Sequence, residues 1–207
     1  MGFLYPKVSR RDLPVMLGFA FAGAIVAGAY GAMHDQLTYS ISPEYFTRLK
    51  FQQFSYADFG LTERLFVAEI GFLATWWVGL VAGWLLARVS VPNQSREIAT
   101  RQVLTGSSMV LAAALIAGGV GYALGRPSGA DADYTAWRPL GSQLGIAELE
   151  DFVHVAYIHN ASYLGGLVGL IAALAYAYRQ RRARFRTAAE AAVPPGKPAD
   201  LPPSRPA

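Results

Sequence analysis

Four long apolar segments constrain the fold of this chain more than any other feature of its sequence. They cover residues 14–33, 65–87, 103–125 and 152–178, and the first and third contain no charged residue. A transmembrane helix needs about 20 mainly apolar residues to cross a hydrocarbon core of roughly 30 Å. In lipid the backbone must satisfy its own hydrogen bonds, which favours helices. The sequence therefore predicts an all-α integral membrane protein, built as a bundle of four transmembrane helices.

The distribution of Lys and Arg predicts how these helices are oriented. Eleven of them precede the first segment, separate the second from the third, or directly follow the fourth within Arg179–Arg186, whereas five lie in or beside the other two loops. Loops rich in Lys and Arg stay on the cytoplasmic side of a membrane. We therefore predict that residues 1–13 and the C-terminus are cytoplasmic. Removal of the first segment as a signal peptide is the alternative, but that segment exceeds the usual apolar length of a signal peptide.

The absence of cysteine limits the possible kinds of site and indicates the type of membrane. The chain contains no cysteine, which excludes disulfides, thiolate zinc sites and iron–sulfur clusters. The predicted topology and the lack of cysteine are typical of a multi-pass protein of a bacterial inner membrane. No motif for nucleic-acid binding accompanies the positive charge, so we expect no nucleic-acid partner.

The regions outside the four segments have distinct characters. The first outer loop is rich in Tyr and Phe, and Ser42-Pro43-Glu44 is typical of a helix start. We predict a short interfacial helix over about 43–54 that lies along the outer membrane surface; the alternative is a lid over the mouth of the bundle. Residues 187–207 are rich in Pro and Ala and predict a disordered cytoplasmic tail.

Two further patterns indicate partners besides the lipid bilayer. The cluster Arg179–Arg186 contains five arginines, and we expect it to set the topology and to bind anionic lipid. Three of the segments contain GxxxG pairs, which let helices approach closely. We predict that these pairs pack within the bundle; association with a second copy or with another membrane protein is the alternative. The pairs are Gly79 with Gly83, Gly121 with Gly125, and Gly165 with Gly169.

The ionisable residues of the outer half indicate where a site would lie. Ten of the fourteen Asp and Glu residues and all three His residues fall on that side. Ionisable groups inside a membrane are costly and usually face the bundle interior. We predict a metal site that uses Glu69 with His154 or His159, together with His34 or Asp35. Such ligands suit a divalent ion such as Zn, Mn or Fe, while His34 and His159 are the pair that would hold a haem.

Three functions are compatible with these patterns. The chain has no phosphate loop, nucleophile elbow or HExxH motif, so the sequence does not point to an enzyme. The leading prediction is a non-enzymatic accessory or scaffold subunit. The first alternative is a redox or ligand-binding protein with a metal or haem in the outer half. The second is a small oligomeric cation or proton transporter that uses Glu69.

Overall fold

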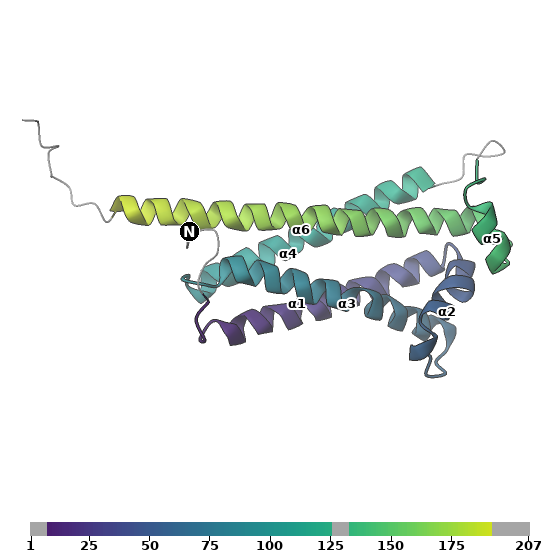
Figure 1. Cartoon of the computed structure of the whole chain (residues 1–207), viewed down its shortest axis with the longest axis horizontal. Coiled ribbons are helices and arrows are strands. Elements are labelled where there is room, and N and C mark those ends of the chain that lie inside the picture. The colour runs from purple at the N-terminus through teal and green to yellow at the C-terminus, as the bar shows by residue number, and fades with distance from the viewer. Residues whose placement is uncertain (1–7, 126–132, 192–207) are drawn as a thin grey trace, which may run out of the picture.

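The chain folds into an all-helical bundle, shown in Figure 1. The computed structural model describes residues 8–125 and 133–191, except the side chains of 188–191. Four long helices, α1 (Leu13–Tyr39), α3 (Glu63–Ser90), α4 (Arg96–Gly125) and α6 (Leu149–Ala191), contain the four predicted segments. All four are long and apolar enough to span a membrane, which confirms the predicted all-helical fold with four candidate spans. The orientation of the bundle stays a prediction.

Short helices complete the bundle at one end, which we call the outer end. They are η1 (Tyr45–Lys50), α2 (Phe51–Gln53), η2 (Ser55–Ala57) and α5 (Arg138–Leu144). The opposite, inner end carries the tight turn between α3 and α4. In Figure 1, α2 and α5 both lie at the outer end, which is at the right of the view.

The long helices expose a wide apolar surface and bury only a narrow face. On α1, Met16, Ala20 and Ala24 are buried, whereas Leu17 and Phe21 are exposed. In the most apolar window of each long helix, between 22% and 28% of the residues are buried inside the protein. Water would disfavour so much exposed hydrocarbon, whereas lipid tails accept it. This surface therefore fits direct contact with a lipid bilayer.

Glycine contacts assemble the long helices into two antiparallel hairpins, α1 with α3 and α4 with α6 (Figure 1). Gly79 and Gly83 lie against backbone atoms of α1, and a Cβ on either would collide with a carbonyl oxygen there. Similarly, a Cβ on Gly121 would lie 2.7 Å from the Tyr157 carbonyl oxygen of α6. Gly165 and Gly169 meet α4. All three predicted GxxxG pairs thus face another helix of the same chain, so these faces are not free to bind a second copy.

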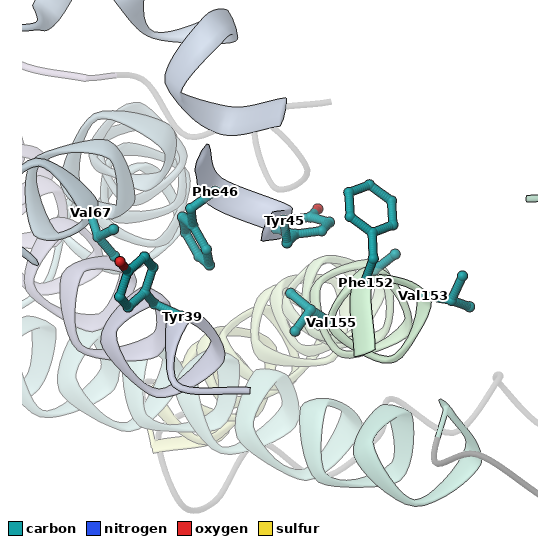
Figure 2. Close-up of a cluster of buried hydrophobic side chains, with 8 residues drawn as sticks. Tyr39, Tyr45, Phe46, Val67, Phe152, Val153 and Val155 are labelled. Atoms are coloured by element: carbon teal, nitrogen blue, oxygen red, sulfur yellow. The ribbon is translucent and has the colours of Figure 1, made fainter. Parts of the chain in front are cut away.

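Two apolar clusters hold the hairpins together, one at each end. The inner cluster gathers side chains of α1, α3, α4 and α6, among them Met16, Leu86, Val103 and Ala173. The outer cluster joins the hairpins through the segment after α1. Figure 2 shows its Tyr45 between Phe46 and Phe152, the last of which belongs to α6.

The segment after α1 turns back over the outer end of the bundle. The Ser42 hydroxyl accepts a hydrogen bond from the Tyr45 N–H at 3.3 Å, which is the geometry of an N-cap. Residues 45–50 then form a π-helix, a rare element that is frequent at functional sites. Tyr45 and Phe46 are 7% and 0% exposed, so this part of the segment covers the protein as a lid. Its contact with a membrane surface stays a prediction.

Helix α6 is much longer than a membrane requires. Its 43 residues extend through the cluster Arg179–Arg186 and end at Ala191. Of the predicted disordered tail, 187–191 therefore belong to a helix, and the rest, 192–207, lies outside the described residues. Arg181 is buried, and its Nη1 donates to the carbonyl oxygens of Val89 and Pro92 at 3.0 and 2.8 Å.

Candidate metal centre

Three metal-ligating side chains converge beneath the lid, where α1 meets α6. His34 and Asp35 lie one turn before the end of α1, and His159 lies in the first half of α6. A ligand atom from each can be chosen so that all three lie within 4.8 Å of one another. Asp35 Oδ1 lies 3.4 Å from His34 Nδ1 and 3.8 Å from His159 Nε2. In the described residues this is the one such cluster of three His, Asp or Glu side chains.

Both imidazoles have a hydroxyl group at the ring nitrogen that is remote from Asp35. His34 Nε2 lies 3.3 Å from Ser162 Oγ, and His159 Nδ1 lies 3.2 Å from Tyr163 Oη. Histidines that bind a metal typically donate their other ring N–H to such a partner, which fixes their orientation. The hydroxyls therefore aim the two remaining nitrogens, His34 Nδ1 and His159 Nε2, at the Asp35 carboxylate.

The distances fit a small divalent ion after minor adjustment. A tetrahedral ion with metal–ligand bonds of about 2.1 Å separates its ligand atoms by about 3.4 Å. The two contacts of Asp35, at 3.4 and 3.8 Å, are close to this separation. Two imidazoles and one carboxylate form a ligand set that leaves further coordination positions open. Thr38 Oγ1, which lies 3.1 Å from His159 Nε2, is the nearest additional oxygen.

Aromatic rings of the lid shield this cluster. The Tyr45 ring centroid lies 4.9 Å from that of His159, and the Phe46 ring centroid lies 6.1 Å away. His159 is only 1% exposed and Asp35 only 5%. An ion bound here would be excluded from bulk water, which strengthens its interaction with the carboxylate.

The lid also places a cation close to the cluster. Lys50 Nζ lies 5.7 Å from the centroid of the Tyr45 ring. Burial lowers the pKa of Lys50 below its ordinary value, and the Asp35 carboxylate partly opposes this shift. Burial raises the pKa of the Tyr45 hydroxyl, so this group stays neutral at physiological pH. Lys50 is therefore the cation that partly balances the Asp35 charge.

One carboxylate fastens the lid to α6. Glu44 Oε2 accepts hydrogen bonds from the backbone N–H groups of Ala147 and Glu148 at 3.0 and 2.8 Å. These groups directly precede the first residue of α6, where the helix dipole favours a negative charge. Glu44 thus links the first outer loop to the second and holds Tyr45 against the cluster.

The structure separates the four residues that the sequence nominated as metal ligands. His34 and His159 come together, with their ring centroids 4.7 Å apart. His154 is directed at α4 instead, and its Nε2 lies 2.9 Å from the Tyr122 carbonyl oxygen. Glu69 belongs to no cluster of three such ligands in the described residues, and its buried Oε2 has no hydrogen-bond partner there. A site built on Glu69 or His154 therefore has no geometric support.

Sequence reasoning missed most of the supporting groups. Asp35 was one of two options for a ligand, and Thr38, Ser162 and Tyr163 were not considered. The available signal was helical spacing: Asp35 and Thr38 lie three apart on α1, and His159, Ser162 and Tyr163 lie three and four apart on α6. These spacings place side chains on one face of each helix.

The distances do not fit a haem between the two histidines. Axial histidines bind the iron from opposite faces of the macrocycle, which must lie between the rings. Here the His34 and His159 rings are in edge contact at an angle of 85°, and their centroids are 4.7 Å apart. The macrocycle would have to push α1 and α6 apart.

A second chemical arrangement shares two of these residues. Ser162, His34 and Asp35 are connected in the order of nucleophile, base and carboxylate that acyl transfer uses. However, Ser162 is only 3% exposed, and its hydroxyl is so close to Gly118 that a Cβ there would lie 2.5 Å from it. A substrate carbonyl group has no access to the Ser162 hydroxyl, so metal binding is the chemistry that this geometry favours.

Comparisons with protein-family models, with curated proteins and with solved structures give no match.

Proposed function

We propose that this four-helix chain is a metal-binding membrane protein that holds a divalent ion of the Zn, Mn or Fe class through His34, Asp35 and His159. The observation that carries the proposal is the convergence of two imidazole nitrogens and a carboxylate oxygen within 4.8 Å in a shielded part of the bundle. The hydroxyl partners of both imidazoles support it, because they match the outer shell of metal-bound histidines.

The ion would join the two hairpins at the outer end. His34 and Asp35 belong to α1 of one hairpin, and His159 belongs to α6 of the other. Metal binding would therefore stabilise the packing of one hairpin on the other, because the ion binds the folded state selectively. This role is compatible with the scaffold function that the sequence favours, and it also supplies the ion of the redox alternative.

The transporter alternative receives less support. It requires Glu69 at the ion site, and Glu69 is not part of the cluster of His34, Asp35 and His159. Transport also requires a path for the ion on both sides of the site, whereas Tyr45 and Phe46 cover the cluster on its outer side.

Elemental analysis tests the proposal. The protein is purified in detergent from cells grown with added Zn, Mn and Fe, and bound metal is measured per chain. We expect stoichiometric metal in the unmodified protein and its loss in His159→Ala and in the milder variant Asp35→Asn. His154→Gln is the matched control, because it removes a buried histidine of α6 outside the cluster and should keep the metal.

The same measurements also show which outcomes would contradict the proposed metal site. Size-exclusion profiles of every variant establish that the protein is folded. Metal-free but folded wild-type protein, which also fails to bind added ions, would leave the scaffold function as the better explanation. Equal metal loss in His154→Gln and His159→Ala would show that the cluster is not the site.

A further inference from the structure

The inner end of the bundle contains a buried guanidinium group without an acidic partner. Arg181 of α6 is 3% exposed, and in the described residues no carboxylate lies within 4.0 Å of it. Its Nη1 donates to the carbonyl oxygens of Val89 and Pro92, while its Nε has no hydrogen-bond partner among the described residues. Buried charges in proteins are normally paired with an opposite charge.

Two other buried polar groups in the same region are also without partners. Ser90 is fully buried, Gln102 is 3% exposed, and neither the Ser90 hydroxyl nor either amide atom of Gln102 has a hydrogen-bond partner in the described part of the chain. Most buried polar atoms in native proteins do have a partner. Arg181 Nε, the Ser90 hydroxyl and the Gln102 amide are thus three buried polar groups without a hydrogen-bond partner at the same end of the bundle, a pattern that a bound ligand would explain.

The helix register brings these three side chains together. A Cβ on Gly106 of α4 would contact Leu86 of α3 and Ala173 of α6, so these residues share one level of the bundle. One helical turn further toward the inner end, α3 presents Ser90 and α4 presents Gln102. Arg181 lies two turns beyond Ala173, and its bond to the Val89 carbonyl oxygen places its head group beside Ser90.

The unsatisfied groups are mainly donors, and the local charge is positive. The Arg181 Nε–H, the Ser90 O–H and the Gln102 NH₂ can all donate, and only the Gln102 amide oxygen is an acceptor. Arg88 adds a second guanidinium that interacts electrostatically with Arg181. The carbonyl oxygens at the end of α3 supply a partial charge of only about −0.5, so they do not balance the charge of Arg181.

We propose that Arg181, Gln102 and Ser90 form a binding site for a phosphate group at the inner end of the bundle. A phosphate offers several strong acceptor oxygens and the negative charge that this site lacks. The group belongs either to the headgroup of an anionic phospholipid or to a free phosphate in the cytoplasm. Because the three side chains are at most 3% exposed, the inner end of the bundle must open for the phosphate to enter.

Full-length protein in nanodiscs of phosphatidylcholine alone tests this site. One arm adds inorganic phosphate, and the other replaces part of the lipid by phosphatidylglycerol; the midpoint of thermal unfolding is measured in both. We expect the midpoint to rise by about 5 °C in at least one arm. A rise with phosphate alone identifies a free ligand, and a rise with phosphatidylglycerol alone identifies the headgroup.

Three variants determine whether the buried site causes the rise. Arg181→Gln and Gln102→Leu should both abolish the rise in the midpoint. Gln102→Leu stays informative if Arg181→Gln does not fold, since this substitution replaces an unsatisfied amide by an apolar group. Arg182→Gln removes the same charge from an exposed neighbour and should keep the rise. The proposal is overturned if neither arm stabilises the protein, because water would then satisfy these groups. It is also overturned if Arg182→Gln abolishes the rise or Gln102→Leu leaves it intact.

Discussion

The proton on His159 can be placed from its hydroxyl neighbours. When the Thr38 hydroxyl donates to the His34 carbonyl oxygen at 3.1 Å, it accepts from His159 Nε2–H. The Nδ1 atom then accepts the Tyr163 hydroxyl proton. A metal ion on Nε2 requires the other tautomer, in which Nδ1–H donates to Tyr163 Oη. Tyr163 can serve both states, because its hydroxyl is donor and acceptor.

Removal of the Tyr163 hydroxyl should therefore weaken metal binding without unfolding the protein. In Tyr163→Phe we expect the affinity for Zn²⁺ to fall by about 10–100-fold, which is the usual effect of losing an outer-shell partner. Competition with a chromogenic chelator measures this change. Tyr157→Phe is the control, because Tyr157 is exposed to a similar extent on the same helix. Equal affinities in wild type and Tyr163→Phe would contradict the outer-shell role.

Lys50 leads to a prediction about pH. Its pKa in the folded state lies below its ordinary value of 10.5, mainly because of burial. Between the two pKa values the unfolded chain binds more protons than the folded one, so stability increases as the pH rises toward 10.5. Lys50→Met should raise the thermal midpoint of the metal-free protein at pH 7. It should also reduce the increase in midpoint between pH 7 and 10.5, and an unchanged pH profile would rule out this effect.

At the scale of the helices, the close contact of α1 with α3 depends on glycine. A Cβ on Gly79 would collide with the Gly23 carbonyl oxygen, whereas a Cβ on Gly119 of α4 meets nothing within 4 Å. We expect Gly79→Ala to lower the free energy of unfolding by about 1–3 kcal/mol, the usual effect of overpacking. Gly119→Ala should raise it, because Ala favours helix. Unfolding in mixed micelles of SDS measures both, and equal effects would refute the packing argument.

The lid provides a second prediction at this scale. Glu44→Gln keeps the size of the side chain but removes the charge that the Ala147 and Glu148 N–H groups contact. Hydrogen bonds to a charged group contribute about 1.5–3 kcal/mol each. We therefore expect faster hydrogen exchange over residues 42–50 and faster metal release. Glu148→Gln, which keeps its backbone N–H, is the control. Unchanged exchange in Glu44→Gln would show that other contacts hold the lid.

The sequence determines where the helices lie along the chain better than it determines which helix faces pack together. The long helices follow from apolar length alone, because lipid allows few alternatives to a helix. Which helices become neighbours depends on close contacts that no single segment encodes. The predicted site combined the second segment, through Glu69, with the fourth and the first. The cluster joins only the first and the fourth.

The two histidines of α6 illustrate this limit. His154 and His159 are five residues apart, which rotates their side chains by about 140°. The sequence could therefore predict that they do not share an ion. It could not predict which of them faces α1, because that depends on the face of α6 that α4 occupies. The sequence likewise leaves an interfacial helix and a lid as alternatives for the first outer loop, since buried and membrane-facing aromatic residues have the same composition.

At the scale of the whole molecule, the lack of cysteine makes the orientation directly testable. Single cysteines at the exposed positions Ser95, in the turn between α3 and α4, and Ser55, in the first outer loop, would be the only thiols. In intact cells an impermeant maleimide should label Ser55→Cys and not Ser95→Cys, and membrane disruption should expose both. The reverse pattern would invert the predicted topology and with it the side of each proposed site.

The length of α6 has a mechanical consequence. One unbroken helix carries His159 and Arg181, 22 residues apart, which corresponds to about 33 Å. The whole helix measures about 65 Å, well beyond the roughly 40–45 Å of a bilayer with its headgroups. Because a helix resists compression, the distance between these two residues of the proposed sites is fixed. A thinner or thicker membrane can only change the tilt of α6, and both residues must then move together.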